Sequence, residues 1–346
     1  MIRLPTEIVR ELEPRYRDRR VCVTGGAGFI GGHLVDALVR LGASVTVIDD
    51  LSNADLEHLS GLIELEPARV RFVHGSVLEP EAVEHAIGPA SVVFHLGAVC
   101  SVPRSIENPT RSWEVNATGT IRVLEAARHA GVKRVIFSAS SSAYGNATTL
   151  PVTEAMLPSP LSPYAASKVA GERLMQAYAE SYGMSTVSLR YFNIFGPRQR
   201  SGSPYSGVIP KFVEAAMRGE PLTLNGGGDQ SRDFTYVGNA VLANLLAGAS
   251  TAPLAGRVLN IGTGTRTTVR ELAERVLAAF GRPASDAVEA PERMGEVKHS
   301  LADIDAAREA IGYRVVSDFD EGLGLTLDWW RGGAAAASGA RERGEA

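Results

Sequence analysis

A glycine-rich turn between a short apolar strand and a helix constrains the fold more than any other feature. Residues 20–24 read RVCVT, a buried strand, and residues 25–31 read GGAGFIG. This spacing satisfies G-x-G-x-x-G from Gly26 and also G-x-x-G-x-x-G from Gly25. The glycines let the backbone turn sharply and approach a pyrophosphate at the N-terminus of the helix expected at residues 29–41. The stretch predicts a dinucleotide-binding domain.

An acidic pair follows the second strand, where a dinucleotide-binding domain holds the ribose. The strand at residues 44–48 leads into Asp49 and Asp50, roughly 20 residues after the glycine turn, where a carboxylate binds the ribose hydroxyls. Both carboxylates would repel a 2′-phosphate, and residues 49–58 contain no arginine to hold one. The pair therefore favours NAD over NADP.

The order of the expected elements indicates the fold class. Further strands are expected at residues 69–74, 91–96 and 134–138, with helices between them and a long helix over residues 113–130. Alternation of strand and helix gives a parallel sheet with helices on both faces. The fold class is therefore α/β, with a Rossmann-type doubly wound parallel sheet and a smaller C-terminal substrate-binding lobe.

The 346-residue chain is long enough for two such lobes. We expect a charged, helical lead-in at residues 1–19 and an NAD-binding domain at residues 20–185, to which later segments return. After the strand at residues 185–190 the helical alternation loosens and glycine and proline become more frequent, so residues 186–331 are assigned mainly to the substrate lobe. The Gly/Ala/Ser-rich tail, residues 332–346, is expected to be disordered.

A tyrosine and a lysine four residues apart, with a serine cluster upstream, are candidate catalytic residues. Pro163 suits the first position of a helix, which would place the Tyr164 and Lys168 side chains on one face. A phenol with a pKa of about 10 is a poor base at neutral pH, but a neighbouring ammonium and a nicotinamide cation favour the phenolate. A hydroxyl from the serines at residues 140–142 could hold the substrate oxygen beside it. Alone, Tyr-x-x-x-Lys is an ordinary amphipathic pair, and only the upstream nucleotide fingerprint favours catalysis.

Charge and hydropathy argue against several classes of partner. The net charge is −4 and no long basic run occurs, so no nucleic-acid partner is expected. The first seven residues lack an apolar signal core and no apolar run approaches ~18 residues, so we expect no membrane partner and a cytoplasmic protein. Cys22 and Cys100 lie in an expected buried strand and at a strand end, as core or site-wall thiols rather than a disulfide. No metal site is expected.

Several motifs follow one another in an order typical of one family. They are TGGAGFIG at residues 24–31, DDLSN at 49–53, HLGA at 95–98, the serines at 140–142, Tyr164-x-x-x-Lys168, and RYFNIFG at 190–196. Across about residues 20–330 the chain resembles the extended short-chain dehydrogenase/reductases, and within them the nucleotide-sugar 4-epimerases. The stretches SVPRS at 101–105 and GEVKHSLAD at 295–303 are most similar to bacterial UDP-N-acetylglucosamine 4-epimerases.

The resemblance implies roles for individual residues. Tyr164 is the catalytic base, Lys168 binds the nicotinamide ribose and lowers the Tyr164 pKa, and Ser140, four residues before Tyr144, is the catalytic serine. The residues expected to contact NAD are Gly25, Gly28, Phe29, Ile30, Gly31, Asp49, Asn53, Ser76, Val77, Leu96, Ala98, Asn116, Tyr164, Lys168 and Tyr191. Those expected to contact the UDP-sugar are Ser101, Ser141, Ser142, Asn193, Val208, Arg232, Arg293 and Ser300, with the two arginines clamping the diphosphate.

Two positions depart from the family pattern, and one has a second interpretation. Ser76 stands where the family usually has an aspartate that holds the adenine amine, which puts that contact in doubt. Cys100 replaces a small glycine near the sugar pocket and could narrow it. Asn116, a polar residue among apolar ones, is equally explained as a buried amide satisfied within the protein.

The expected function is an NAD-dependent UDP-sugar 4-epimerase, an isomerase that uses a transient 4-keto intermediate. The small Ser300 favours N-acetylhexosamines, because epimerases restricted to other sugars carry a bulky aromatic there. Ser141 and Ser142 cannot titrate near neutral pH, which argues against a dehydratase or a decarboxylase. A UDP-glucuronate or UDP-xylose 4-epimerase, another NAD-dependent reductase and a non-catalytic NAD-binding protein stay as alternatives. The resemblance suggests a homodimer through the helices at residues 113–130 and 163–182.

Overall fold

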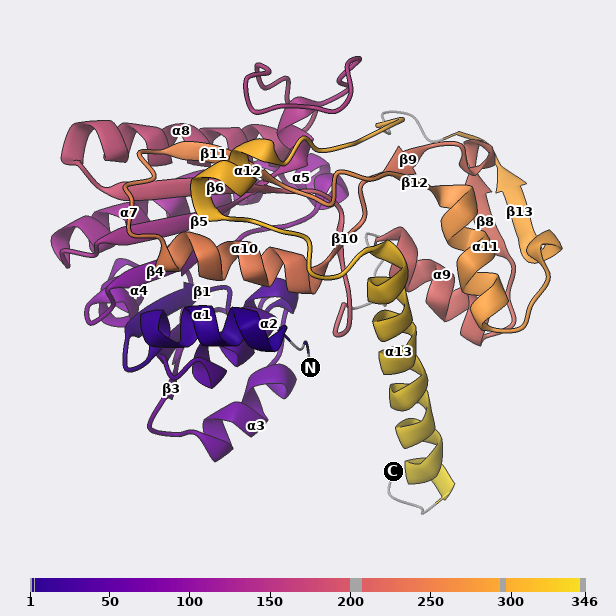
Figure 1. Ribbon diagram of the computed structural model, residues 1–346, viewed down its shortest axis with the longest axis horizontal. Helices are drawn as coiled ribbons and strands as arrows, with labels where there is room; N and C mark the ends of the chain where they lie inside the picture. Colours follow the sequence, from indigo (N-terminus) through magenta and orange to yellow (C-terminus); the bar gives the residue numbers. More distant parts are fainter. Residues whose placement is uncertain (1, 3, 200–206, 293–296, 343–346) are drawn as a thin grey trace.

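The central element of the computed structural model is a seven-stranded parallel sheet (Figure 1). The structure describes residues 2, 4–199, 207–292 and 297–342. The sheet order is β11-β6-β5-β4-β1-β2-β3, and every neighbouring pair is parallel. The strands are β1 (Arg20–Thr24), β2 (Ser44–Asp49), β3 (Val70–His74), β4 (Val92–His95), β5 (Arg134–Ser140), β6 (Ser185–Tyr191) and β11 (Arg257–Ile261). The predicted Rossmann-type fold class is confirmed.

Helices cover both faces of this sheet, which explains why its inner strands are apolar almost throughout. One face carries α2 (Phe29–Arg40) and α10 (Val237–Ala249), and α1 (Thr6–Tyr16) packs on α10. The other face carries α4 (Pro80–Ile87), α7 (Gly119–His129) and α8 (Pro163–Tyr182). The remaining helices of this part are α3 (Glu57–Leu65), α5 (Val102–Glu107), α6 (Pro109–Trp113) and α12 (Asp305–Ile311).

The single helix expected over residues 113–130 is wrong in detail. The structure has α6, then a π-helical turn, η1 (Glu114–Thr118), and then α7. The wide turn contains Asn116, whose side chain bonds to the backbone of Val99 and to the Ser167 hydroxyl. An inserted residue of this kind turns a side chain towards a particular partner, and π turns often occur near functional sites.

A smaller group of elements lies to one side of the sheet, on the right of Figure 1. It contains α9 (Val208–Met217), α11 (Val269–Ala279), and strand pairs β8 (Leu222–Asn225) with β13 (Ala287–Ala290) and β9 (Ser231–Arg232) with β12 (Thr267–Thr268). Short turns η3 (Gly226–Gly228) and η4 (Ala284–Asp286) complete it, while β7 (Ile194–Phe195) pairs with β10 (Thr235–Tyr236). Thr268 begins α11 with a capping box to Glu271.

The C-terminal helix differs from the expected disordered tail. Helix α13 runs from Phe319 to Glu342, so it includes residues 332–342 of the segment expected to be disordered (Figure 1). Residues 334–337 are four alanines, and alanine has the highest helix propensity of any residue type. Among the residues described, none of the helices combines the length and apolar character needed to cross a bilayer.

Candidate active site

A large cavity opens at the C-terminal ends of the parallel strands, the usual ligand-binding edge of a doubly wound sheet. Its volume is about 1350 Å³, above the roughly 300–1,000 Å³ of pockets that hold one small molecule. The cavity therefore has room for a dinucleotide and a second ligand together. All predicted site residues in the described part of the chain line it except Ser76, Asn116 and Val208, and Arg293 lies outside the described residues.

The glycine turn forms a cradle that fits a dinucleotide pyrophosphate. Gly25 has a φ of +69°, and a Cβ placed there would lie 2.7 Å from the backbone nitrogen of Gly97. A Cβ on Gly31 would lie 2.1 Å from the carbonyl oxygen of Gly25. Gly28 caps α2 without a side-chain acceptor, which leaves the free N–H groups of the first helical turn to an anion. The residues present thus fit the pyrophosphate of NAD.

Asp49 lies at the end of β2 and lines the cavity beside this cradle. Its two carboxylate oxygens accept hydrogen bonds from the backbone nitrogens of Ala27, at 3.0 Å, and Leu51, at 2.9 Å. Burial raises the pKa of this carboxyl, while the two hydrogen bonds oppose that shift. These bonds fix the side chain at the place predicted for the ribose contact.

Two arginines that the sequence argument did not find come close to the same end of the cavity. Arg111 on α6 lies 3.6 Å from the Asp50 carboxylate, and Arg104 on α5 donates a 3.1 Å hydrogen bond to the Asn53 side chain. Both line the cavity. Asp50 is therefore partly neutralised, and Asp49 carries most of the expected repulsion of a 2′-phosphate.

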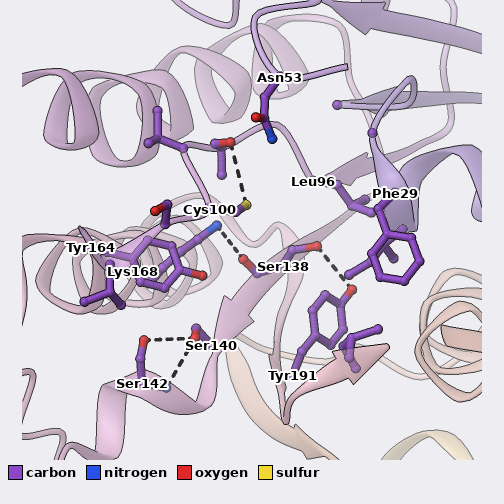
Figure 2. A pocket seen from close by; sticks show the side chains of 18 of the residues that line it. Phe29, Asn53, Leu96, Cys100, Ser138, Ser140, Ser142, Tyr164, Lys168 and Tyr191 are labelled. Atoms are coloured by element: carbon purple, nitrogen blue, oxygen red, sulfur yellow. Dashed lines mark hydrogen bonds between the residues drawn. The ribbon is translucent and has the colours of Figure 1, made fainter. Parts of the chain in front are cut away.

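Helix α8 places the candidate catalytic pair. Ser162 caps the helix and Pro163 occupies its first turn, as the sequence predicts. The Lys168 ammonium donates a 2.8 Å hydrogen bond to the carbonyl of Ser138 and lies 4.9 Å from the centre of the Phe137 ring. Figure 2 shows Tyr164, Lys168 and Cys100 around the same space as Ser138 and Ser140. The bond from Lys168 to Ser138 thus joins helix α8 to strand β5 at the cavity.

The serine cluster lies in the same part of the cavity as Tyr164 and Lys168 (Figure 2). It begins at Ser140, the last residue of β5, and continues in the turn η2 (Ser141–Tyr144). The Ser142 hydroxyl donates a 2.9 Å hydrogen bond to the Ser140 oxygen (Figure 2). The backbone nitrogen of Ser142 donates to that oxygen as well, at 3.2 Å. With two donors engaged on its oxygen, the Ser140 hydroxyl is placed to donate its own proton, either to Tyr164 or to a substrate oxygen.

The protonation of Tyr164 differs from the simple expectation. Burial raises the Tyr164 pKa, the Cys100 side chain raises it further, and an interaction with Ser140 lowers it only in part. The Lys168 ammonium on the same helix donates to the Ser138 carbonyl at 2.8 Å. Burial also lowers the Lys168 pKa, whereas Cys100 and Glu172 raise it. The polypeptide by itself therefore favours the neutral phenol.

The opposite wall carries residues expected to contact the UDP-sugar. The Asn193 amide donates to the Ser300 hydroxyl at 3.2 Å and to the Asp233 carbonyl at 3.4 Å. Arg232 donates 3.0 Å hydrogen bonds to the carbonyls of Ser231 and Lys298. A segment around Ser300 and one around Arg232 thus lie side by side on this wall.

Three predicted contacts do not reach the cavity wall. The Asn116 amide is buried and satisfied by Val99 and Ser167, so the structure favours the buried-amide interpretation. The Ser76 hydroxyl accepts from the backbone of Leu78, and the neighbouring Val77 lines the cavity instead. Val208 packs against the core at the start of α9. These assignments rested on the family resemblance, which does not determine the direction of a side chain in this chain.

The chain is similar to known proteins along nearly its whole length. A sequence profile of the NAD dependent epimerase/dehydratase family matches residues 21–262. A UDP-glucose 4-epimerase of Mycolicibacterium smegmatis is 36% identical over 314 residues, which cover 90% of this chain and 98% of that protein.

Solved structures agree with the sequence comparison. The UDP-N-acetylglucosamine 4-epimerase from Methanobrevibacter ruminantium, in complex with UDP-N-acetylmuramic acid, is 38% identical with a TM-score of 0.84, covering 91% of this chain and 99% of that one. The Thermus thermophilus UDP-glucose 4-epimerase in complex with NAD is 36% identical with a TM-score of 0.80, covering 90% and 99%. The expected enzyme class, an NAD-dependent isomerase, is confirmed by these relatives. This chain belongs to the NAD dependent epimerase/dehydratase family.

Proposed function

We propose that this enzyme is a UDP-sugar 4-epimerase whose substrates are UDP-N-acetylhexosamines, interconverting UDP-GlcNAc and UDP-GalNAc. The observation that carries the sugar preference is Ser300, a small side chain in the cavity wall, hydrogen-bonded to Asn193 at 3.2 Å. A bulky residue at this place would fill the volume that an acetamide at C2 of the sugar needs.

In this proposal Tyr164 takes the proton of the sugar 4-hydroxyl, and Ser140 donates a hydrogen bond to the same oxygen. NAD⁺ bound in this cavity would supply the acceptor for the C4 hydride and a positive charge next to Tyr164. Lys168, held at 2.8 Å by the Ser138 carbonyl, offers its other N–H groups to a ribose hydroxyl. Arg232, with Arg293, anchors the diphosphate while the 4-keto sugar turns over and presents its opposite face.

Elimination or decarboxylation needs a further acid or base next to the catalytic serine, and the two positions after Ser140 are both serines. Ser141 and Ser142 stand beside Ser140, and neither titrates near neutral pH. In the described part of the chain, the acids lining the cavity are Asp49, Asp50 and Glu107, on β2, the residue after it, and α5. These acids belong to the end of the cavity assigned to the cofactor ribose.

A uronate substrate would need a cation for its C6 carboxylate. Among the described residues, the arginines lining the cavity are Arg104, Arg111, Arg198 and Arg232. Arg104 bonds to Asn53, Arg111 pairs with Asp50, and Arg198 lies 2.9 Å from the carboxylate of Asp36 on α2. Because these three side chains are engaged elsewhere, the site favours an uncharged C6 group.

The test uses the purified full-length protein without added cofactor. The nucleotide released by denaturing it is identified, and UDP-GlcNAc, UDP-glucose, UDP-glucuronate and UDP-xylose are supplied in turn. We expect bound NAD and conversion of UDP-GlcNAc to UDP-GalNAc at the highest kcat/KM, with no net NADH. Preferred turnover of UDP-glucuronate, or a requirement for added NADH that is consumed, would contradict the proposal.

A further inference from the structure

A buried ion pair joins the catalytic helix to the sheet. Glu172 on α8 and Arg190 on β6 form two hydrogen bonds of 2.7 Å each, from Arg190 Nε and from its terminal nitrogen. Their side chains are only 1% and 3% exposed. Withdrawing two charges from water costs several kcal/mol per ion, so such a pair is often no more stable than apolar residues of similar volume. Stability alone therefore does not explain why a buried ion pair stands at this place.

One end of this pair acts on the catalytic face of α8. Tyr164, Lys168 and Glu172 follow one another at intervals of four residues, so their side chains line one face of the helix. The groups that interact electrostatically with the Lys168 ammonium are Glu172 on the same helix, Cys100 on the segment after β4, and His95 on β4 itself. Burial lowers the Lys168 pKa, and Glu172 and Cys100 oppose it.

The other end of the pair reaches the turn after the catalytic serine. The Arg190 guanidinium stacks on the Tyr144 ring with 4.5 Å between the guanidinium carbon and the ring centre. The Tyr144 hydroxyl donates a 2.7 Å hydrogen bond to the side-chain oxygen of Asn260 on β11. Arg190 therefore links α8 and β6, which present Lys168 and Tyr191 to the cavity, with η2, the turn that directly follows Ser140.

Asn260 extends the connection to the sugar wall. Its amide donates to the carbonyls of Val152, at 3.0 Å, and Asp303, at 3.1 Å, and its side chain is fully buried. Val152 lines the cavity and pairs with Ala302 in an isolated bridge, next to Ser300. One amide thus bonds both to the segment that carries Ser300, at Asp303, and to Val152, which pairs with that segment.

We propose that Glu172, Arg190, Tyr144 and Asn260 form a positioning network that joins the face of α8 carrying Tyr164 and Lys168 to the wall that carries Ser300. The inference rests on the proposed function for its kinetic readouts. Because well-placed reacting groups are worth large rate factors, displacing them by about 1 Å costs up to roughly 10²-fold in rate. Glu172, Arg190 and Asn260 act through the residues they hold.

The first test is Glu172→Gln, with Glu172→Asp as the conservative variant. The glutamine would keep the volume but remove the negative charge that raises the Lys168 pKa, so the ammonium is lost at lower pH. We expect kcat to fall about tenfold or more with a small change in KM. The alkaline limb of the kcat profile moves to lower pH, and Glu172→Asp restores the wild-type limb. A surface control is Glu11→Gln, which removes an exposed ion pair with Arg314.

The second test is Tyr144→Phe, which keeps the ring under Arg190 and breaks only the link to Asn260. We expect the KM for the UDP-sugar to rise about threefold or more, because the Ser300 wall loses its support, with a smaller change in kcat. This variant removes a single hydroxyl, so it keeps the proposal testable if Glu172→Gln does not fold. An unchanged KM here, or a folded Glu172→Gln enzyme with the wild-type kcat and alkaline limb, would overturn the network.

A third measurement separates this proposal from the proposed function. The fraction of NAD retained after dialysis is followed against pH for the wild type, Glu172→Gln and Glu11→Gln. As the pH is raised, NAD should be lost at a lower pH from Glu172→Gln than from the other two proteins. That result supports the network even if the wild type turns over none of the sugars. An identical retention profile in all three proteins would count against a role for Glu172 in keeping Lys168 charged.

Discussion

The ammonium of Lys168 and the carbonyl oxygen of Ser138 lie 2.8 Å apart, which fixes the catalytic helix to the strand that ends at Ser140. This bond holds the lysine ammonium against the backbone of β5. Burial raises the Tyr164 pKa, so the polypeptide by itself favours the neutral phenol. Proton transfer at this site should depend on the oxidation state of the bound nicotinamide.

Tyr164→Phe removes the proposed base and leaves the cofactor cradle unchanged. We expect kcat to fall by about 10²–10⁴-fold, the usual contribution of general acid–base catalysis, while NAD still co-purifies. Turnover is measured with UDP-GlcNAc as substrate. Retained NAD is measured by its absorbance after the protein has been denatured. A Tyr164→Phe protein that retains NAD and wild-type turnover would remove Tyr164 from the mechanism.

Ser300→Tyr tests the sugar preference. The larger ring would occupy the cavity wall where an acetamide is proposed to lie, so kcat/KM for UDP-GlcNAc should fall about 100-fold, while UDP-glucose is still turned over. Ser300→Ala is the matched control, because it removes the bond to Asn193 without filling space. Equal losses on both sugars in Ser300→Tyr would point to a general disruption of the wall.

Cys100→Gly tests the thiol that lines the cavity next to the catalytic pair. The Cys100 side chain raises the Tyr164 pKa, so its removal should lower that pKa. The acid limb of the kcat profile is then expected to move to lower pH. Cys100→Ser serves as the comparison of similar size. An acid limb that does not move would show that the thiol does not influence proton transfer.

Asp49→Asn tests the choice of cofactor. The substitution removes the charge that opposes a 2′-phosphate and retains the shape of the side chain, so NADP affinity should improve about tenfold while NAD affinity falls. The apoprotein is titrated with each dinucleotide by calorimetry. Asp50→Asn should have a smaller effect, because Asp50 is already paired with Arg111 at 3.6 Å. If Asp50→Asn improved NADP affinity more than Asp49→Asn, Asp50 rather than Asp49 would be the main residue that repels a 2′-phosphate.

Two buried histidines predict acid sensitivity of the fold. Burial lowers the pKa of both His33 and His95 to about 3, against an ordinary value near 6.5. Below pH 6.5 the unfolded chain binds protons that the folded chain excludes, so unfolding becomes easier by up to about 1.4 kcal/mol per pH unit for each histidine. Urea unfolding at pH 7, 6 and 5 measures this slope. A free energy of unfolding that stays constant over that range would contradict it.

The sequence predicted the parts of the site that depend on local spacing. The glycine turn, Asp49 at the end of a strand, and the helical pair of Tyr164 and Lys168 are set by neighbours in the chain, and the structure has them on the expected elements. The fold class follows equally from the alternation of strands and helices.

Other features depend on which distant segments meet, and local patterns carry no signal for that. Arg111 reaches Asp50 from a helix that follows two further strands of the sheet, and Asn260 reaches Tyr144 across 116 positions of sequence. The wide turn at Asn116 is likewise explained by its bonds to Val99 and Ser167 rather than by its own sequence. The direction of the Lys168 ammonium belongs to the same class, since a carbonyl on β5 decides it.

The outermost strand of the sheet, β11, pairs with β6 only after some sixty-five intervening residues have formed β7, α9, β8 and α10. A fragment that stops before Arg257 would leave β6 as an unpaired edge strand. Its free backbone N–H and C=O groups could then pair with another chain. During synthesis on the ribosome, this edge of β6 can be fully paired only after β11, which ends at Ile261, has emerged.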